Sequence, residues 1–404
     1  MKRIFNYFIN FFTNILVFFI NLFIWRNKKI WLFGSWMGNK FSDNTRFLFQ
    51  YLTEHKTEFG IKKVIWVTRS EEVYNSLIEI GYNDVYMMHS VKSYFYHLKS
   101  GVHIVCNNVS ISRFQYDIMS NLSFGAKKIQ LWHGIGIKAC GIKKQATRKN
   151  FITFLYYSFF NKYFQPGMWG KCFFWAVSEE HARILGSDFG ISYKKFIFGP
   201  YPRLCFMPKL TKEEIKIVER INIEKANRRI ILYLPTFREN YENYLEPLSI
   251  EGFSDFLIKN NILWIQKSHS VGTFDYSDGK CHNFINLKSN FDVNIILDHI
   301  DILISDYSSV TSDAIFKNIV TIDYCPDFDY YKNLDRGFVA DYDNYHCKNF
   351  VSEPNKLCDM ILFCLLNKEK AMEKNEKVKK LLFDRCSSDI KISIWNIIKK
   401  INMI

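Results

Sequence analysis

The chain has 404 residues, of which 48% are hydrophobic, so it is long enough for two domains with large cores and is not intrinsically disordered. Its formal net charge is +14, which favours a polyanion, an anionic membrane surface or a phosphorylated substrate as partner, although many lysines will be ordinary solvated surface. The sequence contains no helix-turn-helix or zinc-finger pattern and no long basic arm, so we expect no nucleic-acid partner.

The N-terminal stretch IFNYFINFFTNILVFFINLFIW, residues 4–25, is the most lipid-like part of the chain. At about 100° per residue its asparagines fall on one stripe of a helix: Asn6, Asn10, Asn14 and Asn21. Basic residues flank the stretch on both sides: Lys2, Arg3, Arg26, Lys28 and Lys29. We predict an amphipathic helix over residues 1–27 that lies in an anionic membrane interface. The length also permits a membrane span, and a helix packed on the protein's own surface is a further alternative.

From residue 28 onward, short apolar runs alternate with helical stretches, which predicts parallel sheets covered on both faces. In FFWAVSEEHARILG a strand runs into a helix whose N-cap is Ser178. Two prolines in GPYPR mark a boundary, so we expect two doubly wound Rossmann-type domains, residues 28–205 and 206–404, with a cleft between them. The end of the second domain is predicted to be helical. The predicted strands lie in KKIWLFGSW, KKVIWVTRS, DVYMMHS, HIVCNN, KKIQLWHG, KKFIFGPYPR, RRIILYLPTFRE, NILWIQKSHS, DILISDYSSV and IVTIDYCPDFD.

Ligands of open α/β sheets bind beyond the carboxyl ends of the strands, and four polar stretches lie at such ends. The first is WHGIGIK, in which His133 is followed by Gly134, Gly136 and Lys138. A neutral imidazole can take a proton from an attacking hydroxyl, the glycines let backbone amides approach an anion, and Lys138 can hold a phosphate. The alternative is a histidine with a purely structural role.

The second and third stretches also carry cationic groups. In LPTFRE, the guanidinium of Arg238 can grip phosphate oxygens; a surface salt bridge with Glu239 or Glu242 is the alternative. In IQKSHS, Lys267 and His269 alternate and therefore point to the same side of an extended strand, which suggests an anion site. The alternative for this stretch is an exposed edge of ordinary polar residues.

The fourth stretch, ISDYSSVTSD, gives the most specific signal. A buried strand ends at Ser305 and Asp306, and Ser308 or Ser309 is expected to cap the next helix, whose free amides would face a phosphate. Asp313 lies four residues after Ser309, on the same helix face, where it could accept from a ribose hydroxyl. Plain helix capping is the alternative, although capping would use only one serine.

Two acidic pairs, Asp327 with Asp329 and Asp341 with Asp343, could be read as metal sites. Their spacing supplies no third ligand, so we interpret them as loop acids and predict neither a metal site nor a cofactor.

In this order, WHGIGIK, PTFR, KSHS and DYSSVTSD resemble the motifs of the CDP-glycerol glycerophosphotransferase family, which makes teichoic acids and capsule polymers. GSWMGNKFSDN and FDYYKNLDRGF extend the resemblance over about residues 28 to 345. It implies a GT-B-like fold with acceptor binding in the first domain and CDP-linked donor binding in the second. It also implies a lipid-linked or glycan acceptor and a location at the cytoplasmic face of the bacterial membrane.

The resemblance assigns residues as well. His133 corresponds to the family's proposed base, and five others correspond to residues around the donor's diphosphate and ribose: Arg238, His269, Ser308, Ser309 and Asp313. Ile135 and Gly136 replace the family's Thr-Pro, Ser270 replaces a proline, and Cys205 stands where an acid is usual. These departures leave the donor site intact and put the identity of the acceptor in doubt.

We therefore expect transfer of glycerol phosphate or another polyol phosphate from a CDP-linked donor to a hydroxyl, with release of CMP. The candidate catalytic residues are His133 and His269; Lys267 and Asp306 join the donor-binding set, and Gly134 and Lys138 are candidates for the acceptor or a phosphate. A nucleotide-sugar glycosyltransferase is the nearest alternative. A non-enzymatic protein that binds polyanionic glycans at the membrane surface is another.

Overall fold

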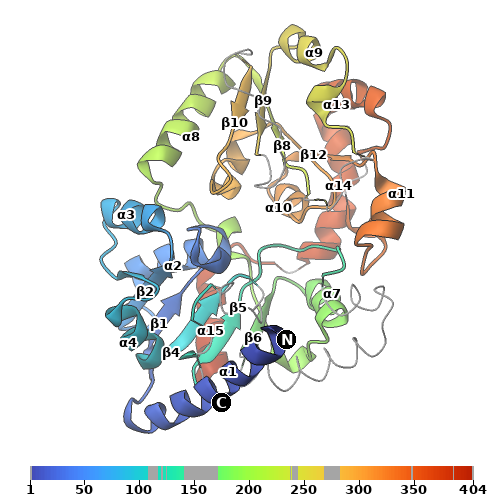
Figure 1. Ribbon diagram of the computed structural model, residues 1–404. Helices are drawn as coiled ribbons and strands as arrows, with labels where there is room; N and C mark the ends of the chain where they lie inside the picture. Colours follow the sequence, from blue (N-terminus) through green and yellow to red (C-terminus); the bar gives the residue numbers. More distant parts are fainter. Residues whose placement is uncertain are drawn as a thin grey trace.

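Two parallel sheets, one of seven strands and one of six, form the frame of the computed structural model (Figure 1). The structure describes residues 2–107, 117–119, 122–123, 125–140, 172–236, 238, 244–267, 283–346, 349–384 and 386–402. Every recorded strand pair in both sheets is parallel. The predicted α/β fold with two parallel-sheet domains is confirmed.

The first sheet has the order β3-β2-β1-β4-β5-β6-β7. Its strands are β1 (Asn27–Phe33), β2 (Lys63–Thr68), β3 (Val85–Met87), β4 (Ser100–Val105), β5 (Lys127–Gln130), β6 (Cys172–Ala176) and β7 (Phe196–Phe198). The helices of this part of the chain are α1 (Lys2–Phe23), α2 (Asp43–His55), α3 (Glu71–Glu79), α4 (Val91–Lys99) and α7 (Glu179–Phe189).

The second sheet has the order β10-β9-β8-β11-β12-β13, which repeats the winding of the first. Its strands are β8 (Arg229–Tyr233), β9 (Ile262–Gln266), β10 (Phe284–Asn286), β11 (Ile302–Ser305), β12 (Val320–Tyr324) and β13 (Phe350–Val351). The helices are α8 (Lys212–Lys225), α9 (Phe253–Lys259), α10 (Val310–Phe316), α11 (Phe328–Tyr330), α12 (Tyr342–Tyr345), α13 (Leu357–Leu366), α14 (Lys368–Phe383) and α15 (Ile390–Asn402).

The winding of each sheet reverses at one point. After β1 the chain continues to β2 on one side of the sheet, whereas after β4 it continues to β5 on the other side. The same reversal occurs between β8 and β11. Ligands of doubly wound sheets bind beyond the carboxyl ends of the strands at this switch point. The fold therefore has two such positions, one in each domain.

Local sequence explains where the elements begin. Ile230, Ile231 and Leu232 of β8 are all fully buried, as expected for a strand covered by helices on both faces. The hydroxyl of Ser178 accepts a hydrogen bond from the backbone amide of His181, which confirms the predicted cap of α7. Thr211 and Glu214 form a capping box at the start of α8.

The two domains share part of their hydrophobic core. One cluster of buried side chains runs from Trp31 and Phe33 of β1 to Tyr307 and Ile315 beyond β11. Because apolar packing of this kind excludes water, the domain interface is a continuation of the core rather than a loose contact.

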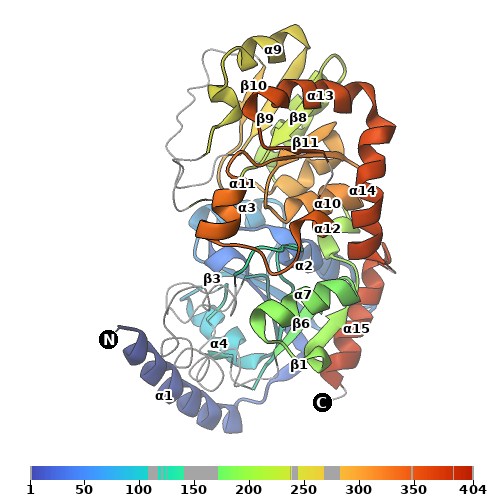
Figure 2. The ribbon, with the colours of Figure 1, turned by 90° about the vertical axis from the view of Figure 1, so that its right-hand side faces the viewer.

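The last helix departs from the predicted division at residue 206. Helix α14 runs along the second domain, and α15 returns to pack on β7 of the first domain (Figure 2). The buried Ile394 and Ile397 of α15 belong to the same apolar cluster as Trp175 of β6. The C-terminal helix is therefore a structural part of the first domain.

We expect Gly199→Ala to weaken this attachment. A Cβ atom on Gly199 would lie 2.5 Å from Cζ2 of Trp175 and 2.9 Å from Oγ of Ser393 in α15. Overpacking of this kind costs about 1–3 kcal/mol, which urea denaturation followed by circular dichroism will measure. The control is Lys391→Ala, because this exposed lysine of α15 contacts Glu58 at the surface and its loss should change little. Equal stability of G199A and the wild type would contradict the tight packing of α15.

Candidate active site at the domain interface

The segment that follows β5 crosses from the first domain to the second. It begins with Trp132, whose φ of +57° is rare for a residue with a side chain, and continues through Gly134 with a φ of +151°. Farther along, Lys138 pairs antiparallel with Phe338, a residue of the second domain. This segment therefore connects the two switch points of the fold.

His133 lies above the switch point of the first sheet. Its Nδ1 atom is 3.3 Å from the backbone carbonyl oxygen of Cys106, the residue that follows β4. A carbonyl oxygen only accepts, so Nδ1 carries the proton and Nε2 keeps its lone pair. The imidazole also packs on Trp36, which follows β1, with the ring centroids 5.2 Å apart. The structure thus holds the tautomer that a general base requires.

The surroundings of His133 favour its neutral form. The ring is exposed to solvent, yet crowding by protein atoms lowers the pKa of the imidazole, and the charges of Lys138 and Arg203 lower it further. The carboxylate of Asp43 and the hydrogen bond to Cys106 oppose this shift without reversing it. Among the described residues, none forms a hydrogen bond with Nε2, so this atom is available to a substrate.

Gly134 brings the loop of His133 against the second domain. A Cβ atom at Gly134 would lie 2.2 Å from Oγ and 2.4 Å from Cβ of Ser309, so only glycine fits here. Ser308 and Ser309 are half-buried, and Ser309 makes no side-chain cap to α10. The expected capping by a serine hydroxyl is thus not observed for Ser309, whose hydroxyl has no hydrogen-bond partner among the described residues. Helix α10 has only seven residues, so we assign no anion site to its N-terminus.

A buried arginine joins the domains next to this contact. Arg203 belongs to the short 3₁₀-helix η4 (Pro202–Leu204) between the domains and is 2% exposed. Its Nη1 atom forms an ion pair with Asp43 at the start of α2, and its Nε and Nη2 atoms donate to both carboxylate oxygens of Asp313 in α10. Burial alone would lower the pKa of Arg203, but the two carboxylates outweigh it and raise this pKa. Asp313 therefore holds the domain interface and is not open to a ribose, which corrects its predicted role.

Asn44, the next residue of α2, supports the same contact. Its Nδ2 atom donates to the backbone carbonyl of Trp132 at 2.9 Å, so it fixes the start of the His133 loop. Arg203 and the loop of the candidate base are thus positioned by neighbouring residues of one helix.

Arg238 has a structural position that differs from its predicted one. The residue is 1% exposed; its Nε and Nη2 atoms donate to Asp327, and its Nη1 atom lies 2.8 Å from Asp306. The guanidinium also stacks 3.7 Å above the ring of Tyr244. Two carboxylates neutralise this cation, so it has no free charge for a phosphate. Asp327, interpreted above as a loop acid, lies in the turn before α11 and is the buried ion-pair partner of Arg238.

Asp306 organises the second switch point from within. Its carboxylate accepts from the backbone amide of Thr236, which follows β8, and from its own neighbour Tyr307, which follows β11. The residue is fully buried. The structure therefore places Asp306 beneath the surface, where it shapes the two loops and does not face a ligand.

Lys267 follows β9 and lies near the first domain. Its Nζ atom donates to the backbone carbonyl of Phe291 at 2.6 Å, which leaves two of its three N–H groups for other acceptors. Burial and the nearby charge of Lys40 lower its pKa to about 8, while Asp292 and Asp43 oppose this shift. Lys267 thus remains mostly protonated at neutral pH.

His269 lies outside the described residues, so its predicted role stays a prediction, as does the alternative pairing of Arg238 with Glu239 or Glu242. In the parts of the chain that the structure describes, no group of three or more His, Cys, Asp or Glu residues is arranged to hold a metal ion.

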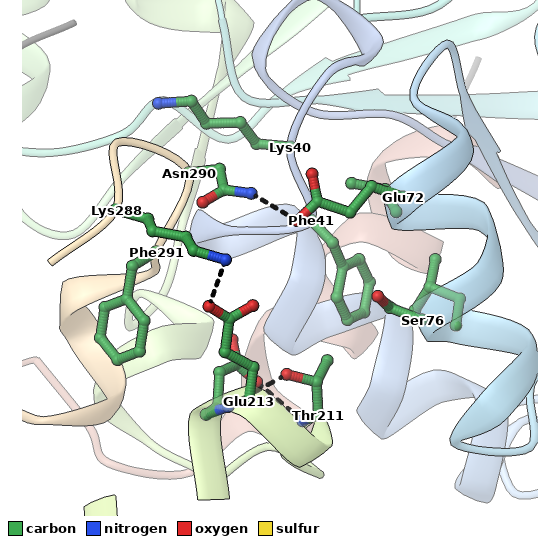
Figure 3. Close-up of a pocket in the computed structure, with 12 residues that line it drawn as sticks. Lys40, Phe41, Glu72, Ser76, Thr211, Glu213, Lys288, Asn290 and Phe291 are labelled. Atoms are coloured by element: carbon green, nitrogen blue, oxygen red, sulfur yellow. Dashed lines mark hydrogen bonds and ion pairs between the residues drawn. The ribbon is translucent and has the colours of Figure 1, made fainter. Parts of the chain in front are cut away.

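A hollow with an empty volume of about 550 Å³ also lies between the domains (Figure 3). It is lined by Lys40 and Phe41, by α3, by the start of α8 and by residues 288, 290 and 291. Lys288 pairs with Glu213 at 2.8 Å, and Asn290 donates to Glu72 of α3 at 3.1 Å. Three glutamates and two lysines line the hollow, so its charge does not favour a phosphate.

Two doubly wound sheets with a histidine-bearing loop between them define a two-domain α/β protein whose candidate site lies at the carboxyl ends of the strands. Residues 16–389 match the model of the CDP-Glycerol:Poly(glycerophosphate) glycerophosphotransferase family. The chain belongs to this family and is an enzyme, which confirms the resemblance seen in its motifs.

Known proteins agree with this assignment. The chain is 26% identical to the teichoic acid poly(glycerol phosphate) polymerase of Bacillus spizizenii over 352 residues, which cover 79% of each chain. It is 27% identical to the teichoic acid glycerol-phosphate primase of Bacillus subtilis over 251 residues, 61% of this chain and 63% of that protein. A structure of the wall teichoic acid polymerase TagF soaked with CDPG has a TM-score of 0.71 at 17% identity and covers 100% of this chain and 97% of that chain. This last likeness shows the shared GT-B-like fold.

Sequence reasoning did not single out Arg203, Asp43 or Trp36 as parts of the site. Asp43 and Trp36 lie within GSWMGNKFSDN, and Arg203 lies within GPYPR, which marked the domain boundary. The arginine next to the prolines of GPYPR was the one sequence signal for this ion-pair site. Its partners, Asp43 and Asp313, are too distant in the sequence to be inferred from it.

We predict that Arg238→Gln destabilises the protein by about 3–5 kcal/mol, because it leaves Asp306 and Asp327 buried without their cation. Urea denaturation of the purified protein measures this loss. The matched control is Arg229→Gln, which removes an arginine that is 62% exposed and 3.7 Å from Asp301, and should have a small effect. Unchanged stability of R238Q with weaker nucleotide binding would instead restore the predicted phosphate contact.

Proposed function

We propose that this enzyme transfers glycerol phosphate, or another polyol phosphate, from a CDP-linked donor to a hydroxyl of a membrane-bound teichoic acid or capsule acceptor and releases CMP. The family match and the names of the relatives support the donor and the polymer class. The observation that carries the proposal is the contact between the two halves of the site: the loop of His133 touches Ser309 across the domain interface.

In this proposal His133 is the general base. The acceptor hydroxyl gives its proton to Nε2, and its oxygen forms a bond to the phosphorus that bears the polyol. The bond from this phosphorus to the bridging oxygen breaks, and CMP leaves with the bond's electron pair. Because the carbonyl of Cys106 accepts from Nδ1–H, it stabilises the imidazolium that forms.

The remaining polar groups act on charge. Lys267 and the hydroxyls of Ser308 and Ser309 are placed at the carboxyl ends of the second sheet, where they can stabilise the negative charge that develops on the leaving diphosphate. Asp306 and Arg238 act as positioning residues beneath them. Nothing in this scheme needs Asp313 as a ribose ligand.

We predict that His133→Ala lowers the rate of CMP release by about 10²–10⁴-fold with CDP-glycerol as donor, because the acceptor hydroxyl loses its proton acceptor. Chromatography of the released nucleotide measures both its rate and its identity. The control is His89→Ala, since His89 is exposed and lies beside Tyr94 on the surface of the first domain. Near wild-type CMP release by H133A would exclude the base, and release of CDP or UDP by the wild type would favour a glycosyltransferase.

We further propose that α1 attaches the enzyme to the cytoplasmic face of the membrane, where a nucleotide-linked donor and a lipid-linked acceptor meet. The helix lies at the edge of the first domain, at the opposite end of the molecule from the second (Figures 1 and 2). Val17 is buried and Asn21 is half-buried. The exposed side chains are largely apolar: Phe12, Ile15, Leu16, Phe18, Phe19, Leu22 and Phe23. Such a face fits the boundary between headgroups and acyl chains.

Two findings refine this part of the proposal. Within the described residues, no helix is long and apolar enough to cross a membrane. Arg26, expected at the headgroups, is instead bound by its guanidinium to the backbone carbonyls of His97, Ser100 and Leu122. This anchor fixes the end of α1 to the first domain, and Lys29 remains exposed beside it.

We predict that the double substitution Phe12→Ser and Phe19→Ser lowers binding to vesicles of phosphatidylglycerol and phosphatidylcholine at least tenfold, about the loss expected from two exposed aromatic groups. Flotation of vesicles in a density gradient measures the bound fraction. Leu366→Ser, which changes an apolar residue that is 81% exposed in the second domain, is the control. Equal flotation of the double variant and the wild type would contradict attachment through α1.

A further inference from the structure

Two cations are brought together beside the second switch point by the pairing of residues from both domains. Lys138 pairs antiparallel with Phe338, and the backbone bonds from Ala139 to Gly337 and from Val339 to Ile137 fix this register. Arg336 lies two residues before Phe338. Arg336 ends the helical turn Tyr331–Asp335, and Gly337, with a φ of +68°, brings the chain from there into the pair with Lys138 and Ala139. Lys138 of the first domain and Arg336 of the second are therefore neighbours.

Neither cation is neutralised by the described part of the chain. No described carboxylate lies within ion-pair distance of Lys138 or Arg336, and neither side chain forms a hydrogen bond with a described residue. Burial lowers the pKa of Lys138; Cys140 and Asp306 oppose this shift, while Arg336 and Arg238 lower the pKa further. Asp306 already binds Arg238 and two backbone amides. Asp335, the residue before Arg336, also lies near Tyr331 and offsets part of the positive charge of the two cations without an ion pair to either of them in the described chain.

Unpaired buried hydroxyl groups lie in the same region. In the described part of the chain, no hydrogen-bond partner reaches the buried hydroxyls of Thr236 and Tyr331 or the Nε atom of Arg336. Thr236 follows β8, and Tyr331 stacks on Tyr307, which follows β11, with the ring centroids 3.8 Å apart. Buried polar groups in proteins normally have partners, so these groups indicate a ligand that supplies acceptors.

We propose that Lys138 and Arg336 together bind the diphosphate of the nucleotide donor, with the hydroxyls of Thr236 and Tyr331 in its vicinity. This inference rests on the proposed function. A diphosphate diester carries two negative charges, which two cations match, and the planar guanidinium suits paired phosphate oxygens. The site is complete only when both domains contribute. Arg336 takes the part that the sequence suggested for Arg238, whose charge is already neutralised.

The test is the affinity of the full-length protein for CDP, measured by isothermal titration calorimetry. We expect Arg336→Gln and Lys138→Gln each to weaken CDP binding about 10- to 100-fold, as for the loss of one charged hydrogen-bonding group. Arg336→Lys keeps the positive charge but loses the planar guanidinium that can bind two phosphate oxygens at once, and should recover part of the affinity. The control is Lys332→Gln, which removes one positive charge from an exposed position in the helical turn just before Arg336 and should bind CDP like the wild type.

The outcomes separate this inference from the proposed function. If wild-type protein neither binds CDP nor releases CMP from CDP-glycerol, the proposed function fails. If the wild type does both and R336Q binds CDP with unchanged affinity, only the present inference fails. An equal loss in R336Q and K332Q would reduce the effect to overall charge and would also overturn it. Thermal unfolding of R336Q and R336K checks that each variant is folded.

Discussion

The relation between the two domains depends on one buried guanidinium. Arg203 lies in the segment between the sheets and holds Asp43 of the first domain and Asp313 of the second. Removing one ion from such a set leaves its partners unpaired in a medium of low polarity, at a cost of several kcal/mol. The domains are therefore held at this point, and the contact between Gly134 and Ser309 beside it is held with them. The ion pairs of Arg203 therefore help to keep the loop of His133 close to Ser309.

This bridge separates the charges of the interface into two sets with different tasks. Arg203 and Arg238 are saturated by buried carboxylates and form the frame of the site. The second set consists of His133, Lys138 and Arg336. Nε2 of His133 and the two cationic groups form no hydrogen bond or ion pair with a described residue. A base and a phosphate site act only when their geometry is fixed beforehand, so the first set supports the second.

The sequence predicted the strands and their order better than the ion pairs between distant residues. Apolar runs such as RIILY and DILIS gave the strands of both sheets, and the order of the motifs placed His133 and Ser309 at strand ends. The short strands β10 and β13 were missed, because polar residues surround their brief apolar runs in HNFINLKSN and KNFVSEP. The partners of Arg238 and Arg203 could not be read from the chain, since Asp327 and Asp313 lie 89 and 110 residues away. Helix α15 was assigned to the wrong neighbour for the same reason: its apolar face shows that it packs, but not where.

The most direct test of the two-domain site is a crystal structure of the full-length protein with CDP bound. The account predicts that the β-phosphate lies between the two domains, within hydrogen-bonding distance of Ser309 or Arg336 and on the side that faces Nε2 of His133. Electron density for the diphosphate at another surface, or with both phosphates remote from the His133 loop, would contradict a site shared by the two sheets.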